Sequence, residues 1–534
     1  MPTFRHAAPW ALALLLPVVL LASCKRRSEP AKSGGAKDTL SVVMIEPRSL
    51  DPARIADAMG RQLAEDLFEG LVARDARGQP VPALAASWTT SSDLLTWTFT
   101  LREGLVWSDD TPLTSADIVW SLRRALLPET QNHQAQTLWV LRGGRALAEG
   151  KAGPDAPLGV SAPDPKTVVL TLERPTPDLL HVLSTAYACP TPRHVIDKHG
   201  AAWTRPEHLV SNGPFVLRAH EAERRMTLER NPRYWDKEHP PALARVEVRF
   251  TTDVKSAEQW FELGEVDWSV SLLSFEGVEA LRKRNAPELS IHDLDGVFYL
   301  VPNTTKAPFD DVRVRRAFDL ALDRGKLTRQ VLNGGEKPAE SFVPPGLTTA
   351  RPPRRVRHDP VKARALLAEA GFGKDRPFPK VELLYNTNDK MRRLAEFFQR
   401  ELTDALGITV QATNVEWKTF LERVDSGDFQ LATLNLSGVS NPIDFTDMLL
   451  SSSTDNRPRW KSSDYDALAE KVRTAATREA RDVAVAALLE LADREVPILS
   501  VYHPTRQALL RPGLAGYEPN GESVHRLRWL SWRP

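Results

Sequence analysis

The chain has 534 residues, with 70 Lys and Arg against 69 Asp and Glu, and so a formal net charge of +1. This balance excludes the strongly basic field with which proteins hold nucleic acid or an anionic surface. Only two cysteines are present, which excludes a disulfide framework. A chain of this length exceeds a single hydrophobic core and is expected to divide into two or three lobes.

The first 24 residues have the pattern of a lipoprotein export signal. The basic Arg5 precedes an apolar run over residues 7–21, and two small residues separate that run from Cys24. The run is shorter than the about 20 residues that a helix needs to cross a bilayer, so we expect a signal peptide over 1–23 that is removed on export. Lipid on Cys24 then anchors the mature protein to a membrane.

An ordinary secretory signal with a chance cysteine is the alternative. Cysteine occurs only twice in the chain, and one copy falls at the cleavage position, which favours the lipoprotein. Residues 24–37 are rich in Ser, Gly, Lys and Ala, as a flexible tether is. The sequence therefore predicts a protein of the periplasm or the cell surface, anchored by lipid at Cys24. Lys25, the residue that follows the anchor, permits transfer to an outer membrane.

Strand-like and helix-like segments alternate from the end of the tether onward. The apolar run 39–45 predicts a strand, and the apolar spacing over 58–71 predicts a helix. Residues 95–101 alternate large apolar side chains with threonine, as a half-buried strand does. Thr114 precedes a helical pattern that continues to Leu126, and its hydroxyl can cap that helix.

The C-terminal half predicts the same alternation, and the whole chain therefore reads as a mixed α/β protein. Arg313, Arg315 and Arg316 follow two aspartates and predict a solvated, salt-bridged helix face. Asp359 is a capping side chain before a proline, and Gly371 supplies the left-handed residue that ends the helix they begin. The apolar pattern then predicts strands over 378–385, 408–412 and 496–502, and helices over 390–406 and 465–491.

Several short stretches, none decisive alone, occur in an order typical of one family. They are Glu46–Pro52, Asp66–Leu71, Trp97–Arg102, Trp107–Thr114, Ser211–Phe215, Arg230–Asp236, Pro308–Ala317 and Glu416–Leu421. In this order, from about residue 40 to the C-terminus, the chain resembles the oligopeptide- and dipeptide-binding proteins of ABC importers, which are solute-binding protein family 5.

The resemblance implies an α/β periplasmic-binding-protein fold of class II, cluster C type. In such a fold two lobes close on a ligand at a hinge, and an extra domain is inserted into the first lobe. By analogy, lobe I comprises 38–68, 193–297 and 505–534, the inserted domain 69–192, and lobe II 298–504.

The resemblance also implies an extended peptide bound as an added strand, with main-chain hydrogen bonds on both sides. By position, one pairing segment is Ala56, Asp57 and Ala58, and the facing segment is Asn435, Leu436 and Ser437. Pairing of this kind depends little on side-chain identity.

The charge-reading positions differ from the family pattern. Gly438 and Val439 stand where the family has an aspartate that pairs with the peptide's α-ammonium group. Without that acid, we expect a free amino terminus to bind less tightly by about 2–5 kcal/mol if the pocket leaves it buried and unpaired. Asp444 or Asp57 could replace the acid. For Asp444 a role as a helix N-cap is favoured, and for Asp57 a solvated loop charge is as good an interpretation as a ligand contact.

Two aromatic residues occupy further family positions. Trp417 stands where the family lines a side-chain pocket, with a place in the core as its alternative. Tyr299 lies in a changed stretch beside Leu300 and Val301, and two arginines of the best-known peptide receptors are replaced as well. These changes leave a non-peptide solute as the alternative ligand class, such as a sugar oligomer, a metal chelate or a modified peptide.

Motifs for enzymatic chemistry are absent from the sequence. His181, Cys189 and His194 are spaced unlike any standard zinc site, and we expect a surface loop with a buried cysteine. No nucleophile elbow, zinc-protease helix or phosphate-binding glycine loop occurs. We therefore expect no catalytic residues, no metal and no cofactor.

Taken with the anchor, the resemblance implies an extracytoplasmic receptor that captures oligopeptides and delivers them to an ABC importer. The permease and ATPase subunits would be separate chains, and the receptor itself a monomer. A lipoprotein hydrolase or an envelope chaperone is the rival from another class.

Overall fold

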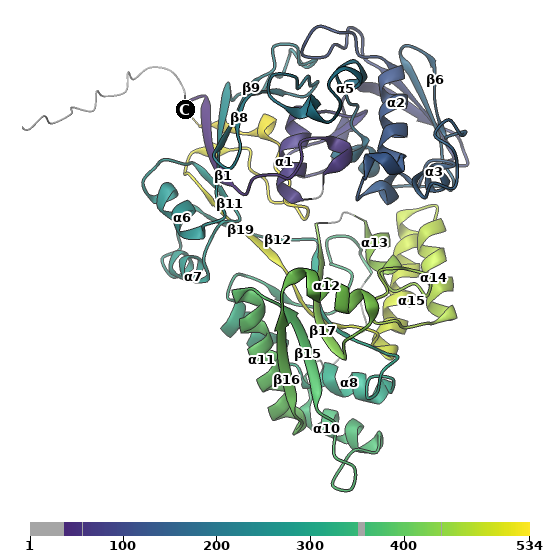
Figure 1. The fold of residues 1–534 in the computed structure, drawn as a ribbon, viewed down its shortest axis with the longest axis vertical. Helices are drawn as coiled ribbons and strands as arrows, with labels where there is room; N and C mark the ends of the chain where they lie inside the picture. Colours follow the sequence, from purple (N-terminus) through teal and green to yellow (C-terminus); the bar gives the residue numbers. More distant parts are fainter. Residues whose placement is uncertain (1–36, 56, 351–357, 439–440, 534) are drawn as a thin grey trace, which may run out of the picture. The chain divides into compact units, whose positions relative to one another are not determined.

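Residues 37–55, 57–350, 358–438 and 441–533 are described in the computed structural model (Figure 1). The chain from Asp38 onward belongs to one compact unit. The predicted anchor Cys24 and the predicted site residues Ala56 and Val439 lie outside the described residues. Among the helices that are described, none is long and apolar enough to span a membrane.

A seven-stranded sheet, here called sheet I, has the order β12-β19-β11-β1-β10-β9-β8. β1 lies in its centre, parallel to β10 and β11, because its apolar side chains are covered on both faces of the sheet. Its strands are β1 (Thr39–Met44), β8 (Phe215–Glu221), β9 (Arg225–Arg230), β10 (Arg245–Phe250), β11 (Trp268–Val270), β12 (Leu289–Asp293) and β19 (Thr505–Leu510). The helices in contact with it are α1 (Ala58–Leu67), α6 (Val254–Glu262) and α7 (Phe275–Lys283), and α5 (Arg193–His199) lies beside α2 (Ser115–Leu126).

A six-stranded sheet, called sheet II, has the order β14-β18-β13-β17-β15-β16. Its strands are β13 (Gly296–Pro302), β14 (Lys337–Pro338), β15 (Val381–Asn386), β16 (Val410–Val415), β17 (Leu431–Ser437) and β18 (Leu499–His503). β13 is buried along its whole length, and alternate residues enter two hydrophobic clusters, one on each face. One cluster includes residues of α8 (Val312–Ala321), α10 (Pro360–Glu369) and α11 (Asp389–Leu406), and the other residues of α12 (Trp417–Ser426), α13 (Pro442–Asp447), α14 (Ser463–Thr474) and α15 (Arg478–Glu495).

A four-stranded antiparallel sheet, in the order β4-β5-β7-β6, is packed against α2 and shares a continuous core with sheet I. Its elements are β4 (Ala85–Thr90), β5 (Thr96–Leu101), β6 (Val160–Asp164), β7 (Thr167–Thr171), α2 (Ser115–Leu126), α3 (Gly144–Ala148) and α4 (Leu179–Leu183). Smaller elements are β2 (Val72–Arg74) with β3 (Pro80–Pro82), β20 (Leu514–Ala515) with β21 (Ser531–Trp532), and α9 (Arg324–Lys326).

The chain passes between the two large sheets at neighbouring points. β12 of sheet I leads into β13 of sheet II, and β18 of sheet II leads through Pro504 into β19 of sheet I (Figure 1). The two passages are bonded to each other, because Leu294 N–H donates to the carbonyl of Pro504 (2.9 Å). His503 Nδ1 lies 2.8 Å from the carbonyl of Gly296. These bonds hold the passages together as a pair.

The mixed α/β prediction is confirmed, and most predicted elements lie within a few residues of their expected bounds. Thr114 forms a capping box with Asp117 at the start of α2. Asp359 accepts from Lys362 N–H (2.9 Å) at the start of α10, and Gly371 has a φ of +88° after its end.

The long helix predicted over 465–491 is wrong, because two helices occupy this region. α14 ends at Thr474, and α15 begins at Arg478 (Figure 1). Between them Thr477 adopts an extended conformation, and its hydroxyl accepts from Ala480 N–H (3.1 Å). The apolar spacing continues through both helices, so the break depends on this capping threonine.

The predicted solvated face of α8 is wrong for one arginine. Arg315 is only 4% exposed, and its guanidinium donates to the carbonyls of Phe309, Glu495 and Val496. Arg313 keeps the predicted character, since it is exposed and pairs with Asp311. Arg315 therefore ties α8 to the end of α15.

Candidate ligand-binding site

Arg61, on α1, reaches the end of β17 and joins the two regions that carry the predicted backbone segments. Its Nη1 donates to the carbonyl of Gly438 (2.8 Å), and its Nη2 lies 3.4 Å from the carbonyl of Glu522. Gly438 has a φ of +75°, and a Cβ there would lie 3.1 Å from Arg61 Nη2. Glycine at this position therefore gives β17 a left-handed end that leaves room for the guanidinium.

Beyond Ala432, β17 presents an open edge. β13 pairs with β17 along its whole length, whereas β15 pairs with it, among the described residues, only at Leu431 and Ala432. Gly438 N–H donates to the carbonyl of Asp295 on the β13 side (3.0 Å). Because backbone direction alternates along a strand, the N–H and C=O groups of Asn435 and Ser437 point to the other edge. That edge can accept an added strand.

The facing segment is built differently. Asp57 is extended and caps α1: its Oδ1 accepts from Gly60 N–H (2.7 Å), and its Oδ2 from Arg48 N–H (3.0 Å). Ala58 is already the first residue of α1. The interpretation of Asp57 as a solvated loop charge is therefore wrong, because its carboxylate is a helix cap. That Asp57 and Ala58 contact a ligand stays a prediction.

The two predicted aromatic residues lie in contrasting places. Tyr299 is 6% exposed and belongs to a hydrophobic cluster of sheet II, where burial raises the pKa of its hydroxyl. Trp417 is 52% exposed and stacks on Phe420, with ring centroids 5.7 Å apart. The alternative that Trp417 is a core residue is wrong, and its exposed ring is available to a ligand.

Asp444 lies in the first turn of α13 and is not its cap, because Asn441 accepts from Ile443 N–H (3.0 Å) and caps the helix. The N-cap interpretation of Asp444 is therefore wrong. The side chain of Asp444 is exposed to solvent at its surface. Protein atoms nevertheless surround the carboxylate closely enough to desolvate its charge. This burial, with the negative charges of Asp447 and Glu522, raises the pKa of Asp444 to about 7. The negative charge of Glu522 therefore acts on Asp444.

Asp295 is a second acid at this place, within the passage from β12 to β13. Its N–H donates to the carbonyl of Gly521 (2.7 Å), and its carboxylate is so close to Gly346 and Gly521 that a Cβ on either glycine would overlap it. Burial and the charges of Glu522 and Asp293 raise the pKa of Asp295 to about 6. Asp295 thus holds the C-terminal segment against the end of β17.

A buried charge cluster lies behind Arg61. Glu522 pairs with Arg74 and lies 3.9 Å from Arg61 Nη1, and these cations outweigh burial and hold the pKa of Glu522 below its usual range. Glu65, on α1, is 3% exposed, and neither of its carboxylate oxygens has a hydrogen-bond partner among the described residues. Burial raises the pKa of Glu65, although Arg74 opposes the shift.

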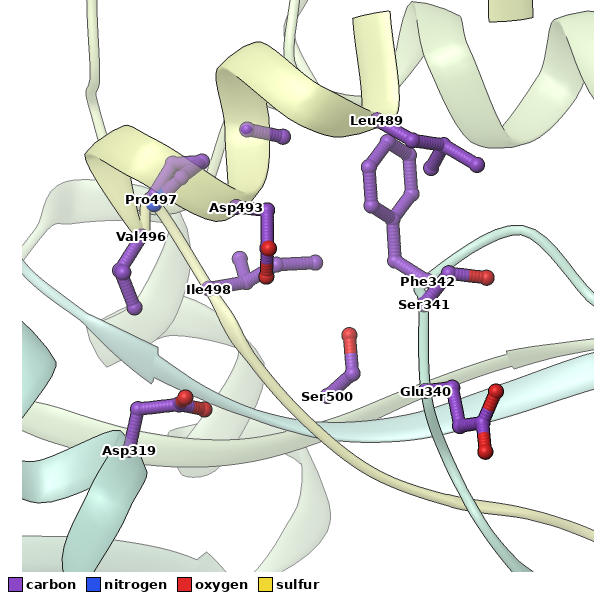
Figure 2. A pocket seen from close by; sticks show the side chains of 11 residues that line it. Asp319, Glu340, Ser341, Phe342, Leu489, Asp493, Val496, Pro497, Ile498 and Ser500 are labelled. Atoms are coloured by element: carbon purple, nitrogen blue, oxygen red, sulfur yellow. The ribbon is translucent and has the colours of Figure 1, made fainter. Parts of the chain in front are cut away.

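Within the part of the chain that the structure describes, two cavities lie away from this site, and neither is lined by Arg61, Gly438 or Asp444. One, of about 30 Å³, lies between α15 and sheet II (Figure 2) and has room for little more than a water molecule. The other, of about 520 Å³, falls in the size range of small-ligand sites. Residues on its wall include Arg48, Asp51, Arg54, Arg124, His133 and Trp203.

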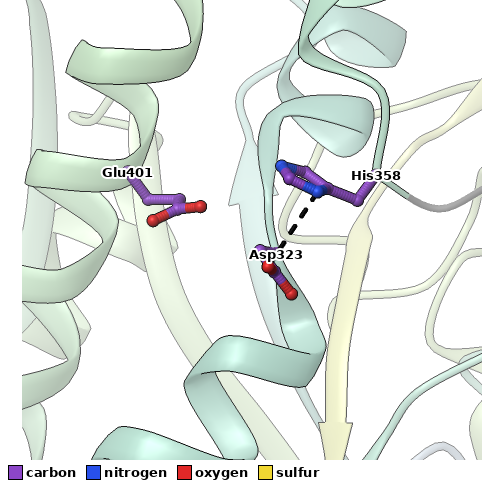
Figure 3. A group of neighbouring side chains, drawn as sticks. All are labelled: Asp323, His358 and Glu401. Atoms are coloured by element: carbon purple, nitrogen blue, oxygen red, sulfur yellow. Dashed lines mark ion pairs between the residues drawn. The ribbon is translucent and has the colours of Figure 1, made fainter.

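Asp323, His358 and Glu401 come together on the surface beside α11, with ligand atoms within 4.8 Å of one another (Figure 3). Lys326 Nζ lies 2.7 Å from Glu401 Oε2, and Asp323 caps α9 through Lys326 N–H (2.8 Å). Because the ammonium group of Lys326 already pairs with Glu401, these side chains form a charge-paired cluster, and we assign them no metal.

His181, Cys189 and His194 do not come together as a set of metal ligands. Cys189 is buried, and burial raises the pKa of its thiol. His194 pairs with Asp109 (2.9 Å), and His181 is on α4. The predicted buried cysteine is confirmed.

Arg61, Glu522 and Asp295 are central to this arrangement, and sequence reasoning missed all three. Arg61 and Glu522 are 461 residues apart in the chain. No local pattern connects them. The single available signal was the pair of glycines, Gly438 and Gly521, at turns where a side chain would be in the way.

Comparison with known proteins identifies a common family. The model described as "Bacterial extracellular solute-binding proteins, family 5 Middle" matches residues 79–457. The periplasmic oligopeptide-binding protein OppA of Salmonella typhimurium is 34% identical over 483 residues, covering 88% of each chain. The probable deoxycholate-binding periplasmic protein YgiS of Escherichia coli is 33% identical over 481 residues, covering 88% of this chain and 89% of its own.

A solved structure shows the same fold. The murein tripeptide binding protein MppA of Escherichia coli superimposes with a TM-score of 0.80 at 30% identity, covering 93% of this chain and 99% of MppA. The two-lobed α/β fold of the periplasmic binding proteins is therefore the fold of this chain.

Proposed function

The chain belongs to the bacterial extracellular solute-binding proteins of family 5, and from this membership we propose that it is an extracytoplasmic receptor for oligopeptides. It delivers them to an ABC importer whose permease and ATPase subunits are separate chains. Members of this family are binding proteins, so we assign no catalytic residue. The receptor acts as a monomer.

The open edge of β17 is the observation that carries the peptide assignment. Asn435 and Ser437 turn backbone donors and acceptors toward the unpaired edge of β17, and Arg61 of α1 donates to Gly438 at the end of that strand. An extended peptide satisfies such an edge with its own main chain, whatever its side chains are. We include Leu436, Gly438, Val439, Ala56, Ala58, Tyr299 and Trp417 in the proposed ligand-binding set on the strength of the family resemblance.

We propose the division of the chain that the resemblance implies. Lobe I comprises 38–68, 193–297 and 505–534, and the inserted domain comprises 69–192. Lobe II comprises 298–504. Sheet I draws its strands from the first of these sets, and sheet II begins with β13, which supports a boundary near Val297.

Calorimetry with matched peptides tests the peptide assignment. A tri- to pentapeptide is compared with the same peptide carrying one N-methylated central amide, which removes a main-chain donor and keeps every side chain. We expect about five- to tenfold weaker binding of the methylated form, the effect of one lost hydrogen bond of about 1–1.5 kcal/mol. A peptide with reordered side chains serves as the control and should bind nearly as well as the parent.

Other outcomes identify the rivals. Equal binding of the methylated and parent peptides contradicts strand addition. If the protein binds no peptide but binds an intact sugar oligomer, metal chelate or other non-peptide tightly, the ligand is not a peptide. Turnover of any bound solute contradicts a receptor. Because Gly438 is not acidic, N-acetylation of the peptide should weaken binding little.

We propose that the mature protein is anchored by lipid at Cys24, in the periplasm or on the cell surface. Cys24→Ser should abolish incorporation of a labelled fatty acid and release the protein from the membrane fraction, because the thiol that carries the lipid is gone. Cys189→Ser is the matched control, since it removes the chain's other cysteine and should leave the label in place. Label retained in Cys24→Ser would refute the anchor.

A further inference from the structure

Arg506, on β19, has a guanidinium group that forms no ion pair with a carboxylate among the described residues. Its Nη1 donates to the hydroxyl of Ser271 (2.7 Å), and its Nε is buried without a hydrogen-bond partner among the described residues. No ion pair of Arg506 occurs within the part of the chain that the structure describes. Burial lowers the pKa of Arg506. The nearby phenol of Tyr517 opposes this shift, and another cation, Arg61, adds to it. A partly buried guanidinium, with its Nε fully buried and unpartnered, calls for an anion.

Two histidines with free ring nitrogens lie beside Arg506. His292 stands opposite it in the register of β12 and β19, is 6% exposed, and has no described partner for either nitrogen. His525 is 4% exposed, and its Nε2 has no partner among the described residues. The two rings are 5.4 Å apart, centroid to centroid. These free nitrogens and Arg506 Nε therefore belong to one cluster.

Both histidines are neutral near pH 7. Burial and the charge of Arg506 lower the pKa of His292 to about 4, and burial with His292 lowers that of His525 to about 3. A neutral imidazole carries one N–H and one bare nitrogen. Since both nitrogens of His292 are unpartnered, it offers one free donor in either tautomer, in addition to the Nε–H of Arg506.

The cluster is next to the candidate ligand-binding site. The backbone of His525 is bonded in both directions to the side chain of Gln62, the neighbour of Arg61 on α1. His292 is three residues before Asp295, and the nearby acids are already held: Asp293 pairs with Lys337 (2.5 Å) and Glu522 with Arg74. Neither acid is an ion-pair partner of Arg506.

We propose that Arg506, with His292 and His525 beside it, forms an anion site that accepts a carboxylate of the bound solute. The guanidinium and the imidazole N–H donate to the carboxylate oxygens in charge-assisted hydrogen bonds. The choice of a peptide carboxylate rests on the proposed function, whereas the anion site itself does not. The carboxylate is either the C-terminus or an acidic side chain of the peptide.

Sodium acetate tests the site without any peptide. The imidazole resonances of His292 and His525, followed by NMR, should shift saturably with acetate in the wild type. They should lose this response in Arg506→Gln and keep part of it in Arg506→Lys, which retains the charge. Arg218→Gln, which removes an exposed arginine of sheet I, should respond like the wild type, and thermal unfolding shows which variants are folded.

Peptides then distinguish the source of the carboxylate. A free-acid peptide containing glutamate is compared with its C-terminal amide and with its Glu→Gln form. One of the two changes should weaken wild-type binding by about tenfold or more, as expected for a lost hydrogen bond to a charged group. In Arg506→Gln that preference should disappear.

The results separate this inference from the proposed function. Absence of an acetate response in the folded wild type, or an unchanged response in Arg506→Gln, overturns the anion site. Peptide binding that ignores both carboxylates overturns the assignment of a peptide carboxylate to this site, while the receptor function stands. An acetate response without binding of any peptide supports the anion site and contradicts the peptide receptor.

Discussion

Glu69→Ala is expected to lower the free energy of unfolding by about 3–5 kcal/mol, as removal of one partner from a buried ion pair does. Glu69 is 1% exposed, and its carboxylate lies 2.9 Å from Arg526 Nη2 and accepts from the hydroxyl of Tyr234 (3.0 Å) and from Trp235 Nε1 (2.5 Å). Without it, Arg526 remains buried at 4% exposure with its main counter-ion gone. Urea unfolding measures the change.

Two further variants show whether the lost pair is the cause. Glu149→Ala removes an exposed ion pair with Arg145 (2.8 Å), and its effect should be too small to resolve. The Glu69→Ala/Arg526→Met double variant leaves neither charge unpaired and should recover part of the loss. A loss below about 1 kcal/mol in Glu69→Ala would mean that water or Asp66 compensates Arg526.

Glu522→Gln is expected to have two effects, one on stability and one on the acids near the site. The change removes the negative charge that pairs with Arg74, which is only 2% exposed, and should lower the free energy of unfolding by about 3 kcal/mol. It also removes a charge that raises the pKa values of Asp444 and Asp295. Both values should therefore fall, from about 7 and about 6.

Carbon-13 NMR of the carboxyl groups across a pH series measures these pKa values. Glu518→Gln is the matched control, because Glu518 is an exposed acid in the same C-terminal segment. Its substitution should leave both pKa values where they are. Unchanged pKa values in Glu522→Gln would contradict the influence of the Glu522 charge on Asp295 and Asp444.

Local chemistry accounts for what could be predicted of the fold. The sequence predicts the starts of helices that have a capping side chain, such as Asp359 and Thr114, because the cap and the first turn are close in sequence. The break at Thr477 was missed, because an apolar pattern that runs through two helices resembles that of one. The burial of Arg315 was missed because its partners are carbonyls of a distant segment, and spacing along α8 carries no information about them.

The candidate site could be predicted only in part, and for a similar reason. The segment Asn435–Ser437 could be placed from its position in the family order, and the structure shows its open edge. The charges near it, Arg61 and Glu522, meet only through the fold. Asp444 was expected to be a cap, yet Asn441 takes that role, since the helix begins one residue before Ile443.

The order of the strands has a consequence for how the newly made chain folds. Sheet II is built from a continuous stretch, from β13 to β18, and it is complete once residue 503 has been synthesised. Sheet I needs β1 from the start of the chain and β19 from near its end, and β19 lies between β11 and β12. Sheet I therefore cannot be completed until β19 is available. Until then, the edges of β11 and β12 that pair with β19 stay open and are prone to association with other chains.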